Sequence, residues 1–231
     1  MIKAGIYGAT GYTGYELVKI LQRHPAAEIA FATSQSQAGK TLRDVFPGAP
    51  AVPLVAGDDA PLDEVDVVFL CLPHAAAAET AMIALGAGAR VIDLSADFRL
   101  RDAAAYAAAY GEAHRAPDWL PRFVYGLPEI NRVALSVARH ASGVGCNAAA
   151  TILTLTALLR AGILRLDQPI IVDLKVGSSE AGRTPTESSH HPARSGVVRP
   201  FALTGHRHEA EVRQAFADLG AVDIRMAITS V

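Results

Sequence analysis

The sequence has few cysteines, few aromatic residues and no excess of positive charge. Its 231 residues include 2 cysteines and 6% aromatics, and its 21 Lys and Arg residues face 23 Asp and Glu residues. Two cysteines cannot form the disulfide framework of a secreted scaffold, so a cytoplasmic protein is expected. A nucleic-acid-binding function is not expected, because no surplus of cations is available to neutralise phosphates.

Long hydrophobic runs are also scarce. Residues 1–8 are apolar with one lysine and lack the layout of a signal peptide. Residues 141–159 carry no charge and reach the length of a membrane-spanning helix. Their first half is rich in glycine and polar residues, however, so a buried helix over 148–161 is expected and no membrane segment.

The first half of the chain alternates between strand and helix patterns. Hydrophobic residues make up 51% of the sequence, which is enough for a folded core. The apolar run at 65–72 is typical of parallel strands that are buried on both faces. The alternation therefore predicts an α/β fold with a doubly wound parallel sheet. The strands are expected at 2–8, 28–34, 65–72 and 90–95, with helices beginning near Tyr15 and at 74–85.

The second half has a different order of elements. Helices are expected over 148–161 and 208–219, and strands over 170–179 and 223–231. Several strands with few helices between them indicate an α+β domain. The boundary is expected near Cys146, which gives a nucleotide-binding domain at 1–146 and a second domain at 147–231.

A glycine-rich loop follows the first strand and opens the first helix. Glycines at this place let the backbone turn tightly and approach a pyrophosphate, while the helix N-terminus supplies N–H groups. The spacing is GxxGxxG rather than GxGxxG, and the alternative is a strand-to-helix turn that binds nothing. The predicted dinucleotide contacts are Gly8, Ala9, Thr10, Gly11, Tyr12, Thr13 and Gly14.

The end of the second strand indicates which dinucleotide is bound. An NAD site usually places an acid there, on the ribose 2′-hydroxyl. Glu28 begins the strand and so lies at the wrong end. The C-terminal end instead offers Ser34, Ser36 and, nearby, Lys40. Hydroxyls and a lysine suit a 2′-phosphate, so NADP(H) is predicted.

The two cysteines have different surroundings. Cys71 lies within an apolar strand, where a core role is expected. Cys146 follows a glycine-rich segment and directly precedes a predicted helix. A helix N-terminus stabilises a thiolate, so Cys146 is a candidate nucleophile. A structural cysteine remains the alternative.

Four of the eight histidines cluster near a group of arginines, and they offer a base for cysteine chemistry. They are His190, His191, His206 and His208. No metal site is expected, because no further Cys or carboxylate stands at ligand spacing. Polar residues exposed at a helix start are the remaining alternative. Arg99, after the strand at 90–95, is expected either to bind an anionic substrate or to form a surface ion pair.

Six motifs occur in order: GATGYTG at 8–14, LPH at 72–74, DLSADFR at 93–99, YGLPE at 125–129, Cys146, and GHRH at 205–208. Together they resemble the N-acetyl-γ-glutamyl-phosphate reductase family, of the aspartate-semialdehyde dehydrogenase type. The resemblance extends over essentially the whole chain. It implies an NADPH-dependent reductase in which Cys146 is the nucleophile and His208 the general acid and base. It further implies cofactor contacts at Leu72, Pro73 and His74, and substrate contacts at Ser95, Arg99, Asn147 and His206.

Two departures from this family pattern refine the expectation. Asn147 and Ala148 stand where the arginine-pathway members usually have an aromatic residue and a proline. With the segment 188–208, this resembles the branch that reduces α-aminoadipyl or glutamyl phosphate bound to an acidic amino-group carrier protein. By hypothesis, Arg183, Arg194 and Arg199 then meet the acidic carrier. Family members also continue past Val231, so the chain is expected to be truncated at its C-terminus and homo-oligomeric when full length.

Three alternatives stay open at this stage. The substrate is either carrier-bound or the free N-acetyl-γ-glutamyl phosphate, for lysine or arginine biosynthesis. A reductase similar to aspartate-semialdehyde dehydrogenase would share the same motifs. A non-catalytic NADP(H)-binding sensor would need the glycine loop but neither Cys146 nor His208.

Overall fold

The computed structural model describes residues 1–231, which form two compact units. The first unit comprises Met1–Arg101 and His114–Gly143, and the second comprises Asp102–Ala113 and Val144–Val231. The boundary expected from the sequence placed residues 102–113 in the first domain, whereas in the structure they pack with the second unit.

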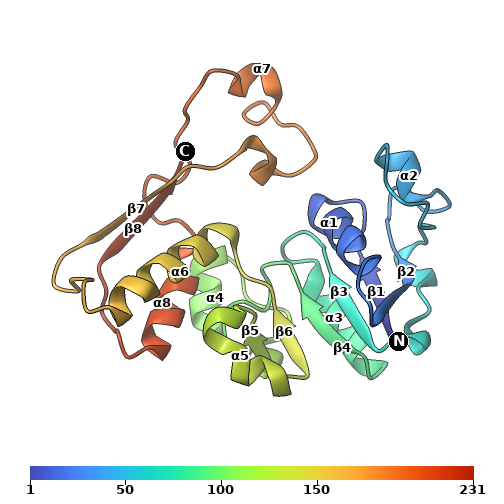
Figure 1. The fold of residues 1–231 in the computed structure, drawn as a ribbon, viewed down its shortest axis with the longest axis horizontal. Coiled ribbons are helices and arrows are strands. Elements are labelled where there is room, and N and C mark those ends of the chain that lie inside the picture. The colour runs from blue at the N-terminus through green and yellow to red at the C-terminus, as the bar shows by residue number, and fades with distance from the viewer. The chain divides into compact units, whose positions relative to one another are not determined.

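The first unit contains a six-stranded sheet in which every pair of neighbours is parallel (Figure 1). Its order is β2-β1-β3-β4-β6-β5. The strands are β1 Ile2–Tyr7, β2 Ala27–Ala32, β3 Val67–Leu70, β4 Arg90–Asp93, β5 Phe123–Tyr125 and β6 His140–Ser142. The predicted doubly wound parallel sheet is thereby confirmed. β5 and β6 have no counterpart in the sequence prediction, because three residues each are too few to show a pattern.

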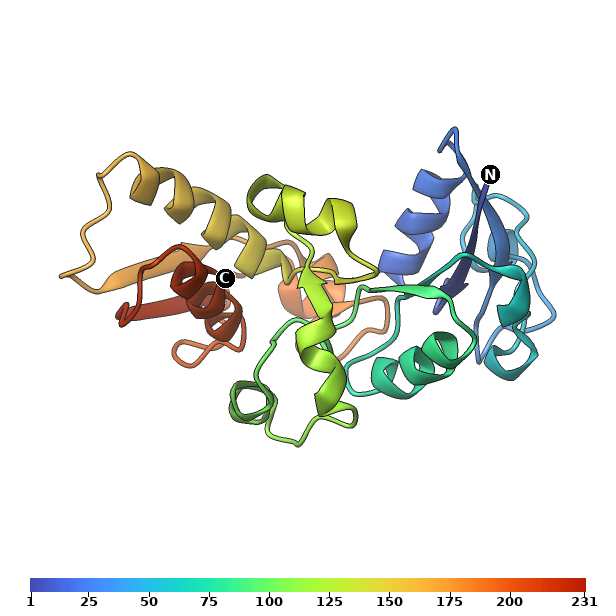
Figure 2. The ribbon, with the colours of Figure 1, turned by 90° about the horizontal axis from the view of Figure 1, so that it is seen from below.

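Helices cover both faces of this sheet, so successive residues of the central strands enter different cores. Figure 2 shows α1 (Tyr12–Leu21) and α3 (Ala77–Gly86) on opposite sides of the strands. Val18 of α1 packs with Ile6 in one core, whereas Ala81 of α3 packs with Val68 in the other. This two-sided burial explains the unbroken apolar runs. The unit also contains α2 (Leu42–Val45) and α5 (Pro128–Val137).

The second unit combines helices with a two-stranded parallel sheet. The sheet pairs β7 (Ile170–Leu174) with β8 (Met226–Ser230). Helix α6 packs along α8 (Figure 1), and buried Ile152, Val212 and Phe216 lie in these two helices. The predicted α+β organisation is confirmed. The helices are α4 Ala103–Tyr110, α6 Cys146–Arg160, α7 His191–Arg194 and α8 Glu209–Asp218.

The uncharged stretch at 141–159 divides between β6, a loop and α6. None of the helices has the combined length and hydropathy that crossing a membrane requires.

Candidate active site

The glycine loop has the close backbone packing that a pyrophosphate cradle requires. Gly8 adopts a φ of +82°, and a Cβ there would lie 2.3 Å from the carbonyl oxygen of Cys71. A Cβ at Gly14 would lie 2.4 Å from the Gly8 carbonyl oxygen. Gly11 caps α1 and no side chain bonds the first N–H groups of that helix. The loop therefore fits a dinucleotide phosphate, because it combines close approach with an uncapped helix N-terminus.

A cavity of about 390 Å³ adjoins this loop. Gly8, Thr33 and Leu72 line it from the C-terminal ends of β1, β2 and β3. Strand order reverses between β1 and β3, and ligands of doubly wound sheets bind at such a reversal. The cavity therefore lies where the sequence predicted the cofactor, and its size suits part of a nucleotide.

The residues predicted to bind the 2′-phosphate have two different roles in the structure. Ser34 is buried, and its hydroxyl lies 2.8 Å from the Thr10 hydroxyl, so it holds the glycine loop in place. Ser36 and Lys40 are exposed, and Lys40 Nζ donates to Gln37 Oε1 at 2.9 Å. A phosphate could replace this single exposed contact of the lysine without leaving a buried group unpaired.

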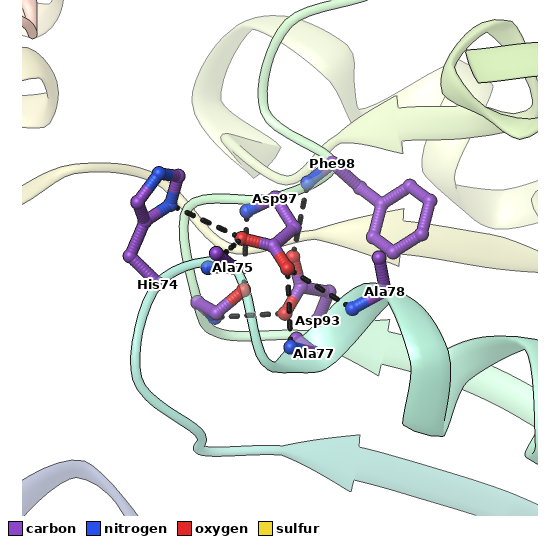
Figure 3. A network of polar contacts seen from close by, with 8 residues as sticks. His74, Ala75, Ala77, Ala78, Asp93, Asp97 and Phe98 are labelled. Atoms are coloured by element: carbon purple, nitrogen blue, oxygen red, sulfur yellow. Dashed lines mark hydrogen bonds and ion pairs between the residues drawn. The ribbon is translucent and has the colours of Figure 1, made fainter. Parts of the chain in front are cut away.

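The LPH segment continues into a turn that a buried carboxylate holds. Asp97 is fully buried and accepts hydrogen bonds from the backbone N–H groups of Ala75, Ala77 and Ala78 at 2.9–3.1 Å. Its Oδ1 also lies 3.1 Å from Nδ1 of His74 (Figure 3). Ala75 has a left-handed φ of 65°, which costs energy for alanine. Asp97 thus caps α3 and fixes the loop that precedes it.

Asp93 organises the other half of the DLSADFR segment. Its carboxylate accepts the N–H groups of Ser95 at 2.9 Å and Phe98 at 3.1 Å, and the Ser95 hydroxyl accepts the N–H of Asp97. Figure 3 shows the Asp93 carboxylate turned toward the backbone N–H of Phe98, and the Asp97 carboxylate turned toward those of Ala77 and Ala78. Ser95 is buried in this turn and Arg99 is half-buried beside it. The sequence prediction missed that most of this motif builds the turn itself.

The fully buried Asp93 should give the protein a characteristic pH dependence. Burial raises its pKa to about 6, although hydrogen bonds from Ser95 and Phe98 act in the opposite direction. The folded state therefore holds the proton more tightly than the unfolded chain, whose carboxyl titrates near pH 4. Its stabilising contribution is present below about pH 4 and lost as pH rises through about 6, a change of about 3 kcal/mol.

Urea denaturation between these pH values tests this expectation. The free energy of unfolding of Asp93→Asn should lack the decline that the wild type shows, whereas exposed Asp118→Asn should retain it. A decline of equal size in Asp93→Asn would contradict the assignment.

Cys146 is the first residue of α6, and Gly145 caps this helix without any side-chain cap. The thiol is exposed, and its Sγ lies 3.5 Å from Oε1 of Glu180. The same carboxylate oxygen accepts a 2.9 Å hydrogen bond from Nδ2 of Asn147. Cys146 and Asn147 thus share Glu180, a residue in the polar stretch for which the sequence gave no signal.

Two buried histidines stand next to this group. The rings of His206 and His208 lie 4.8 Å apart between centroids at 60°, and Nε2 of His206 is 3.4 Å from Nδ2 of Asn147. Nδ1 of His206 accepts the backbone N–H of His208 at 3.1 Å, so the neutral ring carries its proton on Nε2. Burial lowers the pKa of His206, which therefore stays neutral at pH 7.

Glu211 connects the second histidine to the start of α6. Its side chain is fully buried, and Oε2 accepts the N–H of Gly145 at 2.9 Å. Oε1 lies 3.9 Å from Nε2 of His208. A Cβ at Gly145 would lie 2.6 Å from Oε1 of Glu211 and 2.7 Å from Nε2 of His208. The glycine before the cysteine is therefore required for this packing.

The second unit thus brings together four residues that the sequence singled out, and adds two carboxylates. Cys146, Asn147, His206 and His208 are joined through Glu180 and Glu211. His190 and His191 are exposed and take no part in these contacts. Arg194, Arg199 and Arg207 line a separate cavity of about 490 Å³ that also reaches Glu180. Arg183 is exposed and is not among the residues that line it.

A doubly wound sheet with an open glycine loop, followed by a unit with a cysteine at a helix N-terminus, defines a dinucleotide-binding protein with a candidate nucleophile. Residues 3–138 match the family model described as semialdehyde dehydrogenase, NAD binding domain. Residues 146–231 match the one described as semialdehyde dehydrogenase, dimerisation domain. The chain belongs to the semialdehyde dehydrogenase family.

Curated relatives agree with this membership, and a solved structure shares the fold. The chain is 45% identical to a putative [LysW]-L-2-aminoadipate 6-phosphate reductase of Thermomicrobium roseum, over 100% of the chain and 66% of the relative. It is 44% identical to an N-acetyl-gamma-glutamyl-phosphate reductase of Ectopseudomonas mendocina, over 93% of the chain and 63% of the relative. The fold is similar to that of aspartate semialdehyde dehydrogenase II from Vibrio cholerae, with a TM-score of 0.70 and 19% identity. The similarity covers 100% of this chain and 70% of that structure. The chain spans somewhat under two thirds of the length of these curated relatives.

Proposed function

We propose that the protein reduces an acyl phosphate to a semialdehyde with NADPH, through a thioester on Cys146. The observation that carries this proposal is the position of the cysteine. It is an exposed thiol at a helix N-terminus, next to Asn147 and close to two buried histidines. The family, and the relatives named as phosphate reductases, support the same reaction class.

The first half of the reaction forms the thioester. The Cys146 thiolate attacks the acyl carbonyl, and breaking of the carbonyl–phosphate bond releases inorganic phosphate. Gly145 N–H is already bonded to Glu211, so the backbone N–H groups of Asn147 and Ala148 are the ones positioned to stabilise the oxyanion. His206, which carries its proton on Nε2, is assigned to hold the substrate carbonyl together with Asn147.

The second half of the reaction releases the aldehyde. The Gly8–Gly14 loop, together with Leu72, Pro73 and His74, would hold NADPH, which would supply the hydride. The tetrahedral adduct then carries its oxygen as an alkoxide, and its collapse reforms the carbonyl and breaks the C–S bond. His208, which takes the proton of the Cys146 thiol when the thiolate forms, returns it to the departing thiolate. Glu211, 3.9 Å from its Nε2, stabilises the protonated form of this histidine. Arg99 and Ser95 are assigned to the anionic part of the substrate.

The predicted preference for NADPH over NADH rests on Lys40, which is exposed in the segment that follows β2. Lys40→Gln is expected to weaken NADPH binding by about tenfold, because a hydrogen bond to a charged group contributes about 1.5–3 kcal/mol. NADH binding should change little, because NADH has no 2′-phosphate. Fluorescence titration of each nucleotide measures both constants. Lys19→Gln, a half-buried lysine that pairs with Glu16, is the matched control. Equal weakening of both nucleotides would contradict the assignment of Lys40.

For the substrate we propose α-aminoadipyl or glutamyl phosphate bound to an acidic amino-group carrier protein. The bracketed carrier in the names of several relatives supports this choice, although others act on the free N-acetylated compound. In the structure, Arg194 and Arg199 line the cavity that reaches Glu180 beside the thiol. Cations at its rim would steer an acidic carrier toward Cys146. We also propose a homo-oligomer, because residues 146–231 match a dimerisation domain.

The carrier proposal predicts a selective effect of charge reversal. Arg194→Glu combined with Arg199→Glu should raise KM for the carrier-bound semialdehyde by about tenfold or more, with a smaller effect at high salt. KM for the free N-acetylated semialdehyde should change much less. Steady-state kinetics in the direction of acyl-phosphate formation measure both, and Arg165→Glu, which removes an exposed local ion pair, is the control. An unchanged KM for the carrier-bound compound would overturn the assignment of these arginines.

A further inference from the structure

The first unit contains a second cavity at the edge of the sheet opposite the glycine loop. All strands run in parallel, so the starts of β4, β5 and β6 share one edge and the cofactor loops share the other. The cavity measures about 420 Å³, within the range of small-molecule sites. Its lining comes from the segments that precede or begin these strands: Leu85, Ala89, Trp119, Arg122, Arg139 and His140.

The charge at this cavity is positive and lacks a carboxylate counterpart. Arg122 and Arg139 line it, and Arg90 begins the neighbouring strand. The Arg122 guanidinium lies 4.5 Å from the centre of the Trp119 ring, and Nη2 of Arg139 donates to the Gly88 carbonyl at 3.0 Å. These contacts orient the two guanidinium groups without neutralising them, and none of the three arginines takes part in an ion pair.

His140 adds a neutral donor to the cavity wall. It is buried, and its Nδ1 accepts the backbone N–H of Val91 at 3.2 Å, so the neutral ring carries its proton on Nε2. Burial lowers the pKa of this imidazole, and the charges of Arg139, Arg90 and Arg122 act in the same direction. The cavity thus has a positive rim and an uncharged imidazole, which favours an anion and disfavours a metal cation.

We propose that this cavity binds a small dianion, a phosphate monoester or a dicarboxylate, between Arg122 and Arg139. Guanidinium groups bind both kinds of oxyanion through paired N–H donors. A dianion would also relieve the repulsion among the three clustered arginines and would stabilise the folded unit in proportion to its binding. The proposal of this anion site is independent of the proposed reduction of an acyl phosphate, because none of the residues that line it belongs to the cofactor loop or the cysteine site.

Tryptophan fluorescence can detect binding at this site, because Trp119 lines the cavity and is the single tryptophan of the chain. Tryptophan fluorescence is followed while glycerol 3-phosphate, inorganic phosphate or glutarate is added at constant ionic strength, with chloride as the balancing anion. A saturable change is expected with at least one of these dianions. Saturation by the phosphates alone, or by glutarate alone, would identify the preferred oxyanion within the proposal.

Arg139→Gln should weaken that binding by about tenfold or more, because it removes a charged donor without touching the tryptophan. Arg23→Gln, an exposed arginine of the same unit whose Nε bonds the Lys19 carbonyl, is the matched control. Unchanged NADPH binding shows that each variant is folded. No saturable change with any dianion, or equal binding by wild type and Arg139→Gln, would overturn the proposal, and the latter result would place the anion elsewhere.

Discussion

Replacing Cys146 with serine is expected to lower acyl-phosphate reduction by roughly a thousandfold or more, because removal of a covalent nucleophile eliminates the thioester route. NADPH binding should be unchanged, since the glycine loop belongs to the other unit. Steady-state kinetics and a fluorescence titration of NADPH measure the two effects. Surviving turnover in Cys146→Ser would exclude the nucleophile role. An unaltered biological response in this variant, with no turnover in the wild type, would instead support an NADP(H) sensor.

The second cysteine provides the matched comparison. Burial raises the pKa of the Cys71 thiol to about 12, so this thiol is protonated at neutral pH and reacts slowly with alkylating reagents. Cys71 packs in the core formed with α1. Iodoacetamide should therefore inactivate the protein by modifying Cys146 alone. Peptide mapping that found inactivation to follow modification of Cys71 would contradict this account.

Replacing Gly145 with alanine is expected to lower kcat by about a hundredfold, although this residue has no side chain to contribute. Its Cβ would lie within 2.8 Å of atoms of both His208 and Glu211, and the fully buried Glu211 has little room to move. The imidazole must shift, and small displacements of a proton-transfer group cost large factors in rate. The comparison is Gly86→Ala, because a Cβ there meets nothing within 4 Å.

Measurements of kcat, NADPH affinity and pH dependence together distinguish a local effect on His208 from a general loss of folding. Gly145→Ala should lose kcat while retaining NADPH affinity, and Gly86→Ala should match the wild type in both. A pH–rate profile should also show a displaced limb in Gly145→Ala, because the surroundings of His208 change. Wild-type kcat in Gly145→Ala would mean that the contacts among Gly145, Glu211 and His208 are not needed for the reaction.

Patterns that repeat along the chain were sufficient to predict most of the fold. The apolar runs of β1, β3 and β4 predicted a parallel sheet, because both faces of these strands are buried. The three-residue strands β5 and β6 are too short to show a period. The membership of α4 in the second unit depends on tertiary packing, which a local pattern cannot show.

The candidate site was predictable where backbone geometry demands glycine or a helix start. The loop at Gly8–Gly14 and the position of Cys146 are of this kind. Glu211 lies in a helix rich in charged residues, so nothing in its neighbourhood distinguishes it from a solvent-exposed acid. Asp97 follows a strand and resembles a ligand residue, whereas its carboxylate caps α3. Buried carboxylates that bond backbone N–H groups from distant segments leave no local signal in a sequence.

The choice among substrates is open to a direct comparison in the reverse direction. The protein is supplied with NADP⁺, phosphate and one of three aldehydes: the carrier-bound semialdehyde, free N-acetylglutamate semialdehyde, or aspartate semialdehyde. The highest kcat/KM is expected for the carrier-bound compound. A preference for aspartate semialdehyde would overturn the substrate proposal while leaving the role of Cys146 intact.

The thioester on Cys146 is the central claim, and a reverse reaction without phosphate tests it most directly. The semialdehyde and NADP⁺ should then give a burst of one NADPH per active site, because hydride leaves the thiohemiacetal and the resulting thioester has no acceptor. Intact-mass analysis and peptide mapping should locate one acyl group on Cys146, and added phosphate should release it and restore turnover. Continuous NADPH formation without phosphate, or a burst with no acyl group on Cys146, would contradict the account.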